Sequence, residues 1–165
     1  MAKATILGES ELAFLRALIA QDVAFMIVGN SAAVLQGAPV VTQDVDLWFD
    51  NLSDDGIRKA VKKVDGIFVP SFGHNPPMFA GESIKLFDIV FNPQGLESYD
   101  KEKRHNLAVK LADIYVPVLA LSRVIKSKER ANRPKDQAVL PVLKDVLKTL
   151  ELAKRPLHWS ELEKK

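Results

Sequence analysis

Short apolar runs along the chain predict its strands. An unbroken apolar run over residues 24–28 indicates a buried strand, which turns at Gly29 into a short helix that starts near Ser31 and ends near Gly37. The next apolar run, interrupted by two carboxylates, predicts a second strand that ends at about Asp50. Further strands are expected over residues 67–69 and 84–91, and over 107–111 and 114–118 as a pair of edge strands around Ala112–Asp113.

Apolar residues at helical spacing predict the remaining elements. Residues 9–19 indicate a packing helix with Ser10 as its N-cap, and an amphipathic helix follows the cap segment 51–55 and runs to about Val64. Two more helices, over about 119–131 and 135–153, are separated by Asn132–Arg133–Pro134, because the residue before a proline disfavours helical geometry.

Two segments lack a period of either kind. Residues 70–81 are so rich in Pro and Gly that they predict a loop or flap, and the tail from residue 154 is expected to be loosely ordered. We therefore expect one domain over residues 1–153, with a core over 24–118, C-terminal helices over 119–153 and a tail over 154–165.

Composition narrows the class of protein. The chain has 165 residues, of which 47% are hydrophobic, enough for a core. It has no cysteine, so disulfides and thiolate metal sites are excluded. No apolar stretch approaches the roughly 20 residues that a membrane span needs, and the N-terminus lacks the apolar segment of a signal peptide. We expect a cytoplasmic protein with no membrane partner.

Three carboxylates stand in strand segments, where acids rarely add stability. Because side chains alternate along a strand, Asp44 and Asp46 are expected on one face, where they would repel unless a cation or proton lies between them. Asp88 is a lone carboxylate in an apolar run and is expected to be a third buried acid. This pattern predicts a metal site.

Charge is divided unevenly along the chain. Residues 1–100 hold 7 Lys and Arg against 13 Asp and Glu, and residues 101–165 hold 16 against 8. This division suggests an acidic metal-binding half facing a basic anion-binding half, although charge alone favours a solvated basic helical surface.

Four elements in order carry a resemblance. Gly29-Asn30-Ser31, a helix, Asp44-x-Asp46 and a later Asp88 resemble the nucleotidyltransferase superfamily of DNA polymerase beta. The stretch from Val28 to about Val146 is more closely similar to small bacterial nucleotidyltransferases of the AbiEii-like and uncharacterised kinds. The shared motifs are Thr42-x-Asp44-x-Asp46 and a late Ser127-Lys128…Arg133-Pro134-Lys135-Asp136.

The resemblance implies an α/β (α+β) nucleotidyltransferase fold, with a mixed sheet flanked by helices and a helical C-terminal part. It also implies catalysis by two divalent ions, Mg²⁺ or Mn²⁺, which clamp the attacking and leaving oxygens of a phosphoryl displacement. Asp44 and Asp46 would hold both ions, and Asp88 would complete the site and act as general base.

The implied nucleotide site lies at the glycine turn and on the C-terminal helices. Gly29 would let backbone approach the triphosphate, and Ser31 with the free amides of the helix start would supply donors. Asp136 is expected to cap its helix or pair with Arg133 rather than bind metal. The expected nucleotide-binding residues are Gly29, Asn30, Ser31, Lys128, Arg133 and Lys135.

The expected activity is transfer of a nucleotidyl group from an NTP to an unidentified acceptor, which is a small molecule, an RNA or a protein. An aminoglycoside- or lincosamide-modifying role belongs to this class. Many relatives have Arg before the Thr-x-Asp-x-Asp motif, where this chain has Val41. The alternative is therefore a catalytically weak nucleotide-binding or interaction module of a toxin-antitoxin type system, with a protein partner encoded nearby.

Overall fold

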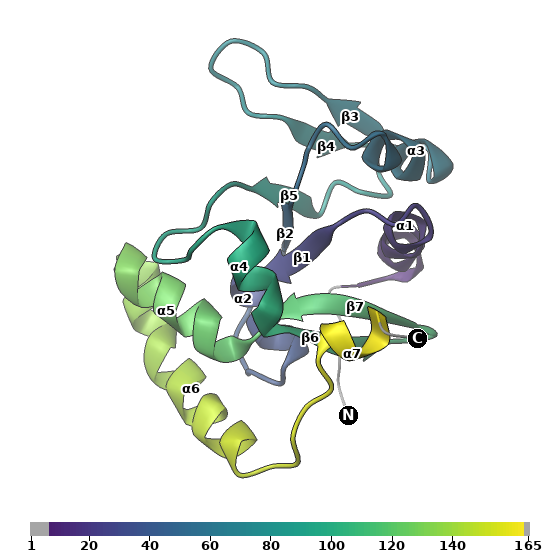
Figure 1. The fold of residues 1–165 in the computed structure, drawn as a ribbon. Helices are drawn as coiled ribbons and strands as arrows, with labels where there is room; N and C mark the ends of the chain where they lie inside the picture. Colours follow the sequence, from purple (N-terminus) through teal and green to yellow (C-terminus); the bar gives the residue numbers. More distant parts are fainter. Residues whose placement is uncertain (1–6, 164–165) are drawn as a thin grey trace.

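A mixed five-stranded sheet forms the centre of the protein (Figure 1), seen in a computed structural model that describes residues 7–163. The strand order is β5-β2-β1-β7-β6. β2 runs antiparallel to β1 and parallel to β5, while β7 runs parallel to β1 and antiparallel to β6. The strands are β1 (Phe25–Val28), β2 (Val45–Phe49), β5 (Phe87–Val90), β6 (Asn106–Leu111) and β7 (Ile114–Leu119).

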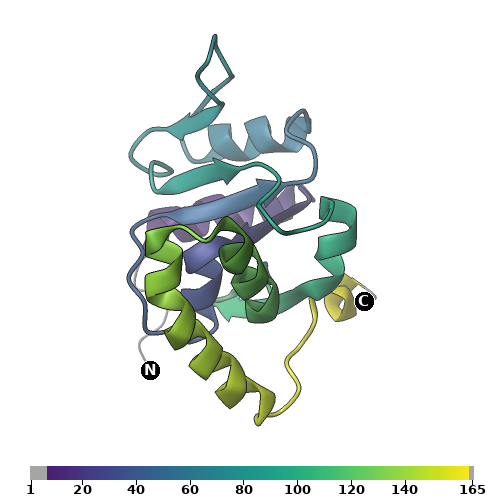
Figure 2. The same ribbon diagram turned by 90° about the vertical axis from the view of Figure 1, so that its left-hand side faces the viewer.

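Helices cover both faces of this sheet (Figures 1 and 2). On one side lie α1 (Glu9–Ala20) and α3 (Asp55–Lys63), which pack on each other. On the other side α2 (Gly29–Leu35) packs on β1, β2 and α5 (Leu121–Ala131), and α5 packs on α6 (Pro134–Glu151). The short helices are α4 (Tyr99–Glu102), the 3-10 helix η1 (Lys103–His105) and α7 (Trp159–Glu163).

The apolar core under α1 is built on aromatic contacts. Phe14 is fully buried, and its ring meets the rings of Phe79 at 5.3 Å and Phe87 at 5.0 Å, both edge to face. Such pairs add to the free energy gained from burial. Because side chains alternate along a strand, burial of Phe87 on the α1 side directs Asp88 to the opposite face of the sheet. Asp46, the register partner of Asp88, lies on that same face, which α2 covers.

The segment expected to be a loop over residues 70–81 contains a strand. β4 (Met78–Ala80) pairs antiparallel with β3 (Ile67–Val69), so the two form a hairpin whose loop projects from the body (Figure 2). The Pro76–Pro77 pair before β4 and Gly81 after it concealed this strand, which forms because β3 offers it a partner.

Three other expectations are corrected. Gly8, not Ser10, precedes α1, and the Glu11 carboxylate accepts the Gly8 N–H at 2.7 Å. β5 starts at Phe87 rather than at residue 84, because residues 82–86 form a turn. β7 is an inner strand that pairs with both β1 and β6, so β6 alone of that pair lies at the edge.

The tail, which the sequence predicts to be loosely ordered, lies against β6. The Ala108 N–H donates to the Leu157 carbonyl at 2.9 Å, and α7 follows. Arg155 and Glu161 form an ion pair at 3.0 Å. Residues 1–6 and 164–165, which belong to the expected domain and tail, lie outside the described residues. Within residues 7–163, no helix has both the length and the apolar surface needed to cross a membrane.

Candidate active site

Two of the three acids are neighbours across the sheet. Asp46 on β2 and Asp88 on β5 are register partners, and residues opposite each other on adjacent strands point to the same face. Asp44 lies in a bend before β2, so its side chain is not placed by strand alternation as expected. The Thr42 hydroxyl donates to the Asp44 carbonyl at 3.1 Å and shapes this bend.

The acids differ in exposure. Asp46 is half-buried, whereas Asp88 is exposed, which corrects the expectation of a third buried acid. The physical reason is the position of β5 at the edge of the sheet, where the face that carries Asp88 is not fully covered.

Electrostatic repulsion between the carboxylates raises their pKa values. Burial, followed by the charges of Asp88 and Asp44, raises the pKa of Asp46 to about 6, although Lys128 and Lys135 act to lower it. Partial desolvation and the Asp44 charge also raise the pKa of Asp88. The uncompensated negative charge at this point favours a bound cation or proton.

Gly29 allows the turn to approach Asp46. Its φ is +65°, a conformation that favours glycine, and a Cβ at this position would overlap the Asp46 carboxylate. The glycine motif therefore positions backbone directly beside the candidate acid.

Ser31 is predicted to donate a hydrogen bond to phosphate, but its hydroxyl is already used within the protein. Its hydroxyl is fully buried, donates to the Val28 carbonyl at 2.7 Å and accepts the Asp46 N–H at 3.1 Å. Both hydrogen bonds tie the start of α2 to β2, so Ser31 positions the backbone of Asp46.

Asn30 has an unused polar atom. Its side-chain Oδ1 is buried and, among the described residues, has no hydrogen-bond partner. A buried polar group left unpaired costs about 1–3 kcal/mol, so the amide is a candidate for contact with a ligand. Asn30 lines the same cleft as Gly29 and Asp46.

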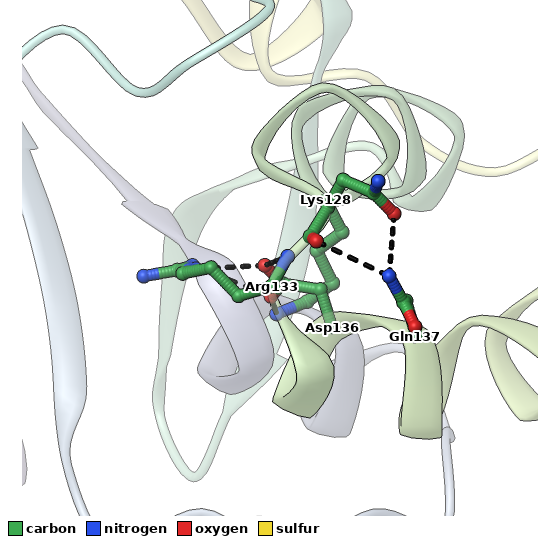
Figure 3. Close-up of polar contacts among 5 residues, drawn as sticks. Lys128, Arg133, Asp136 and Gln137 are labelled. Atoms are coloured by element: carbon green, nitrogen blue, oxygen red, sulfur yellow. Dashed lines mark hydrogen bonds and ion pairs between the residues drawn. The ribbon is translucent and has the colours of Figure 1, made fainter.

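Asp136 organises the junction of α5 and α6 (Figure 3). It is fully buried and accepts the Arg133 backbone N–H at 3.1 Å, the Arg133 Nε at 2.7 Å and the Lys128 Nζ at 3.5 Å. Burial alone would raise its pKa, but the Arg133 hydrogen bonds and Lys128 lower it. Asp136 thus caps α6 and pairs with Arg133, as the sequence indicates.

Lys128 links this junction to the acids. Only 8% of the residue is exposed, and desolvation lowers the pKa of its ammonium group although Asp136 and Asp46 act to raise it. Asn132, in a left-handed conformation at the end of α5, accepts two hydrogen bonds from the Gln137 side chain and fixes the turn between the helices. The side chains of Arg133 and Lys135 are more exposed.

A cleft of about 420 Å³ brings most of the expected site residues together. Its walls come from the start of α2, from β2, from the loop after β5 and from the junction of α5 and α6. Of the expected residues, the lining includes Gly29, Asn30, Asp46, Lys128, Arg133 and Lys135, but not Ser31, Asp44 or Asp88.

Sequence analysis placed residues 90 and 91 at the end of a strand and missed the cleft wall that residues 90–94 form. Asn92 has a positive φ of 38°, and the Gly95 that follows approaches α5 so closely that a Cβ would meet Arg130. The signal in the sequence was Asn92-Pro93-Gln94-Gly95, but only the contact with α5 turns this segment into a cleft wall.

The donor set suits a hard cation bound together with phosphate. Within residues 7–163, no three or more His, Cys, Asp or Glu side chains are grouped closely enough to hold a metal ion by themselves. Mg²⁺, however, is usually held by one or two carboxylates plus substrate phosphates, and Asp46 and Asp88 form such a pair.

Comparison with known proteins places the fold. No family model matches the chain, and no curated protein matches it. A solved structure, the aminoglycoside nucleotidyltransferase ANT(2″)-Ia in complex with adenylyl-2″-tobramycin, is similar with a TM-score of 0.58 and 15% sequence identity. The match covers 86% of this chain and 90% of that one. The chain therefore has a mixed α/β nucleotidyltransferase fold.

Proposed function

We propose that this protein is a metal-dependent nucleotidyltransferase that transfers a nucleotidyl group from an NTP to an acceptor. The observation that carries the proposal is the cleft in which the Gly29–Asn30 turn, Asp46 and Lys128 meet, with Asp88 beside Asp46 on the next strand. The fold shared with a solved nucleotidyltransferase supports nucleotidyl transfer in general. The finer relation to the AbiEii-like proteins rests on the sequence motifs.

The triphosphate binds at the basic side of the cleft. Lys128 is held by Asp136 with its charge close enough to Asp46 to act on that carboxylate, and Lys135 and Arg133 add charge nearer to solvent. Charge-assisted hydrogen bonds from these groups neutralise phosphate oxygens, and Asn30 supplies a further polar contact. Gly29 leaves room for phosphate beside the α2 backbone.

The acids act on the reacting atoms. Asp46 and Asp88 would hold Mg²⁺ or Mn²⁺ together with phosphate oxygens, and the ion would supply charge neutralisation at the attacking and leaving oxygens. Asp88 faces solvent at the sheet edge, where its carboxylate can take the proton of the acceptor hydroxyl.

Labelled nucleotides test the proposal. The protein is incubated with each NTP labelled at the α-phosphate, with Mg²⁺ or Mn²⁺ and a cell extract as the source of acceptors. A labelled product is expected with the unmodified protein and with Asp145→Asn, an exposed carboxylate on α6. The product should be lost in Asp46→Asn and in Asp88→Asn.

Two other results would argue against catalysis. If NTP binds but no product forms under any condition, the alternative of a catalytically weak nucleotide-binding module replaces the proposal. If divalent ions raise the melting temperature of the double variant Asp44→Asn, Asp46→Asn as much as that of the unmodified protein, the metal assignment fails.

A further inference from the structure

A buried ion pair lies behind the cleft wall formed by residues 90–94. Glu102, at the end of α4, is 1% exposed, and its carboxylate accepts two hydrogen bonds from Arg123 on α5. The Arg123 Nε donates at 2.9 Å and the Arg123 Nη2 at 2.6 Å. This bidentate geometry fixes both the distance and the orientation of the two groups. Neither residue lines the cleft, and the nucleotide site proposed above uses neither.

Glu102 also holds the loop that leads from the cleft wall to α4. Its Oε2 atom accepts the backbone N–H of Glu97 at 2.8 Å, three residues beyond the end of the wall. Burial would raise the pKa of Glu102, but the hydrogen bonds from Arg123 and Glu97 and the charges of Arg123 and His105 lower it. The carboxylate therefore stays charged at neutral pH and binds both partners.

A second contact joins the same loop to α5. Gly95 has a φ of +77°, and a Cβ at this position would lie 2.6 Å from the Cβ of Arg130 and 3.2 Å from the Lys126 carbonyl oxygen. Residues three or four positions apart share one side of a helix, so Arg123, Lys126 and Arg130 form a stripe along α5. The loop is thus attached to this stripe at two points, through Gly95 and through Glu102.

Another wall of the cleft belongs to the same helix. Lys128 lies on the buried side of α5 and lines the cleft, as residues 90–94 do. Because α5 carries Lys128 and also anchors the loop, the contacts of the loop with α5 determine how these two walls are placed relative to each other. The position of Asp88 does not depend on those contacts, since its register pairing with Asp46 holds β5 to β2.

Net stability is a poor explanation for burying such a pair. Replacement of a buried ion pair by apolar residues of similar volume is often neutral or stabilising, because the desolvation of two charges offsets their attraction. The helix α4 has four residues, too few for a helix that is stable by itself. The pair instead gives this short helix and the loop before it one fixed position on α5.

We propose that Glu102 and Arg123 are positioning residues for nucleotide binding, which fix the wall over residues 90–94 relative to Lys128. The inference rests on the proposed binding of an NTP in the cleft. Neither residue touches the nucleotide, and both act through the loop that Glu102 holds at Glu97. Loss of the pair releases the wall and weakens its contacts with bound NTP, while the carboxylates on β2 and β5 stay in place.

Nucleotide affinity and wall position are measured on the same full-length variants. Calorimetric titration with a non-hydrolysable NTP and Mg²⁺ gives the dissociation constant, and the side-chain amide signals of Asn92 and Gln94, which line the cleft, report the wall in isotopically labelled protein. Glu102→Gln and Arg123→Lys should each raise the dissociation constant about tenfold and shift both amide signals before nucleotide is added. Asp100→Asn, which alters an exposed carboxylate on α4, should do neither.

Further variants separate positioning from a loss of stability. Urea unfolding identifies conditions in which every variant is fully folded, and binding is measured there. Because both side chains act through one pair, the double variant Glu102→Gln, Arg123→Lys should bind NTP no more weakly than the weaker single variant. Gly95→Ala, which disturbs the second attachment, should also raise the dissociation constant and shift the amide signals. In steady-state kinetics, Glu102→Gln should raise the KM for NTP while kcat stays within about twofold, since Asp46 and Asp88 keep their places.

The outcomes distinguish this inference from the proposed function. Unchanged affinity in the folded Glu102→Gln and Arg123→Lys variants, additive losses in the double variant, or unmoved amide signals would each overturn the positioning role and leave the proposed function in place. Absence of NTP binding by the unmodified protein and by Asp100→Asn alike would refute the proposed function and, with it, the nucleotide role of the pair.

Discussion

Asp46 is the residue on which the candidate site depends. The charges of two other acids and of two lysines act on the pKa of its carboxylate. Its backbone N–H donates a hydrogen bond to the Ser31 hydroxyl. Gly29 comes so close to this carboxylate that a Cβ at position 29 would overlap it. A single side chain thus connects the glycine turn, the acidic strands and the basic helices.

Replacement of Asp46 should change stability in a pH-dependent way. Because burial and its acidic neighbours raise the pKa of Asp46 from 3.8 to about 6, the folded protein binds this proton more tightly than the unfolded chain does. The free energy of unfolding therefore decreases as pH rises from about 4 to about 6, and the deficit persists above that range. Without divalent ions, Asp46→Asn should be more stable than the unmodified protein by roughly 1–3 kcal/mol at pH 8 and nearly equal at pH 4.

Urea unfolding in the presence of a chelator measures this difference at the two pH values. Asp145→Asn, which alters an exposed carboxylate on α6, should behave like the unmodified protein at both. A stability gain of equal size at pH 4 and pH 8 would contradict the electrostatic explanation.

Ser31→Ala should destabilise the protein and weaken catalysis indirectly. The change leaves the Asp46 N–H and the Val28 carbonyl without their shared partner in a fully buried place, at a cost of about 1–3 kcal/mol. Urea unfolding gives the free energy, and Ser53→Ala, in the loop before α3, serves as the control. Unchanged stability would mean that the hydroxyl does not hold the two elements together.

At the scale of elements, the junction of α5 and α6 determines which basic groups reach the cleft. Pro134 opens α6, Asn132 ends α5 in a left-handed conformation, and Asp136 then binds groups from both sides of the break. Lys128 is thereby held inward, although its helix could equally have carried it as a surface residue.

Lys128→Ala should reduce both nucleotide affinity and stability. Loss of a charge-assisted hydrogen bond to phosphate should weaken binding of a non-hydrolysable NTP with Mg²⁺ by about 1.5–3 kcal/mol. Asp136 would keep Arg133 but lose its buried partner, so the free energy of unfolding should fall by about 1–3 kcal/mol. Calorimetric titration and urea unfolding measure the two effects, with Lys126→Ala, exposed on the same helix, as the matched control. Unaltered affinity would make Lys128 a purely structural residue.

At the scale of the whole molecule, the acidic and basic parts of the chain meet across one cleft. Asp46 belongs to the acidic first 100 residues, and Lys128, Arg133 and Lys135 belong to the basic remainder. At these positions the acidic and basic side chains line one cleft instead of only covering a solvated surface. Such a cleft suits a metal-bound polyphosphate.

The tail adds a structural contribution that truncation should reveal. Its backbone extends the β6 edge through Ala108 and Leu157, and its side chains cover a cavity of about 210 Å³ beside α6. Removal of residues 154–165 should lower the melting temperature by several degrees, measured by thermal unfolding, while NTP affinity stays constant because the cleft is elsewhere. Removal of residues 164–165 alone is the control, and an unchanged melting temperature in the longer truncation would show that the docked tail adds no stability.

The amino-acid sequence by itself determined the local elements and the order of the candidate residues. Apolar runs marked β1, β2 and β5, helical spacing marked α1, α3, α5 and α6, and Pro134 marked the break, because each signal depends on neighbours within one turn or strand. The pairing of Asp136 with Arg133 was also readable, since the two residues lie three positions apart.

Only the tertiary structure decided properties that depend on distant partners. Asp88 is exposed because β5 lies at a sheet edge, β7 is internal because it pairs with β1, and β4 is a strand because β3 lies beside it. Ser31 became a positioning residue because β2 brings the Asp46 N–H to its hydroxyl. These facts follow from contacts between residues far apart in the sequence, and local periodicity carries no information about which strand becomes whose neighbour.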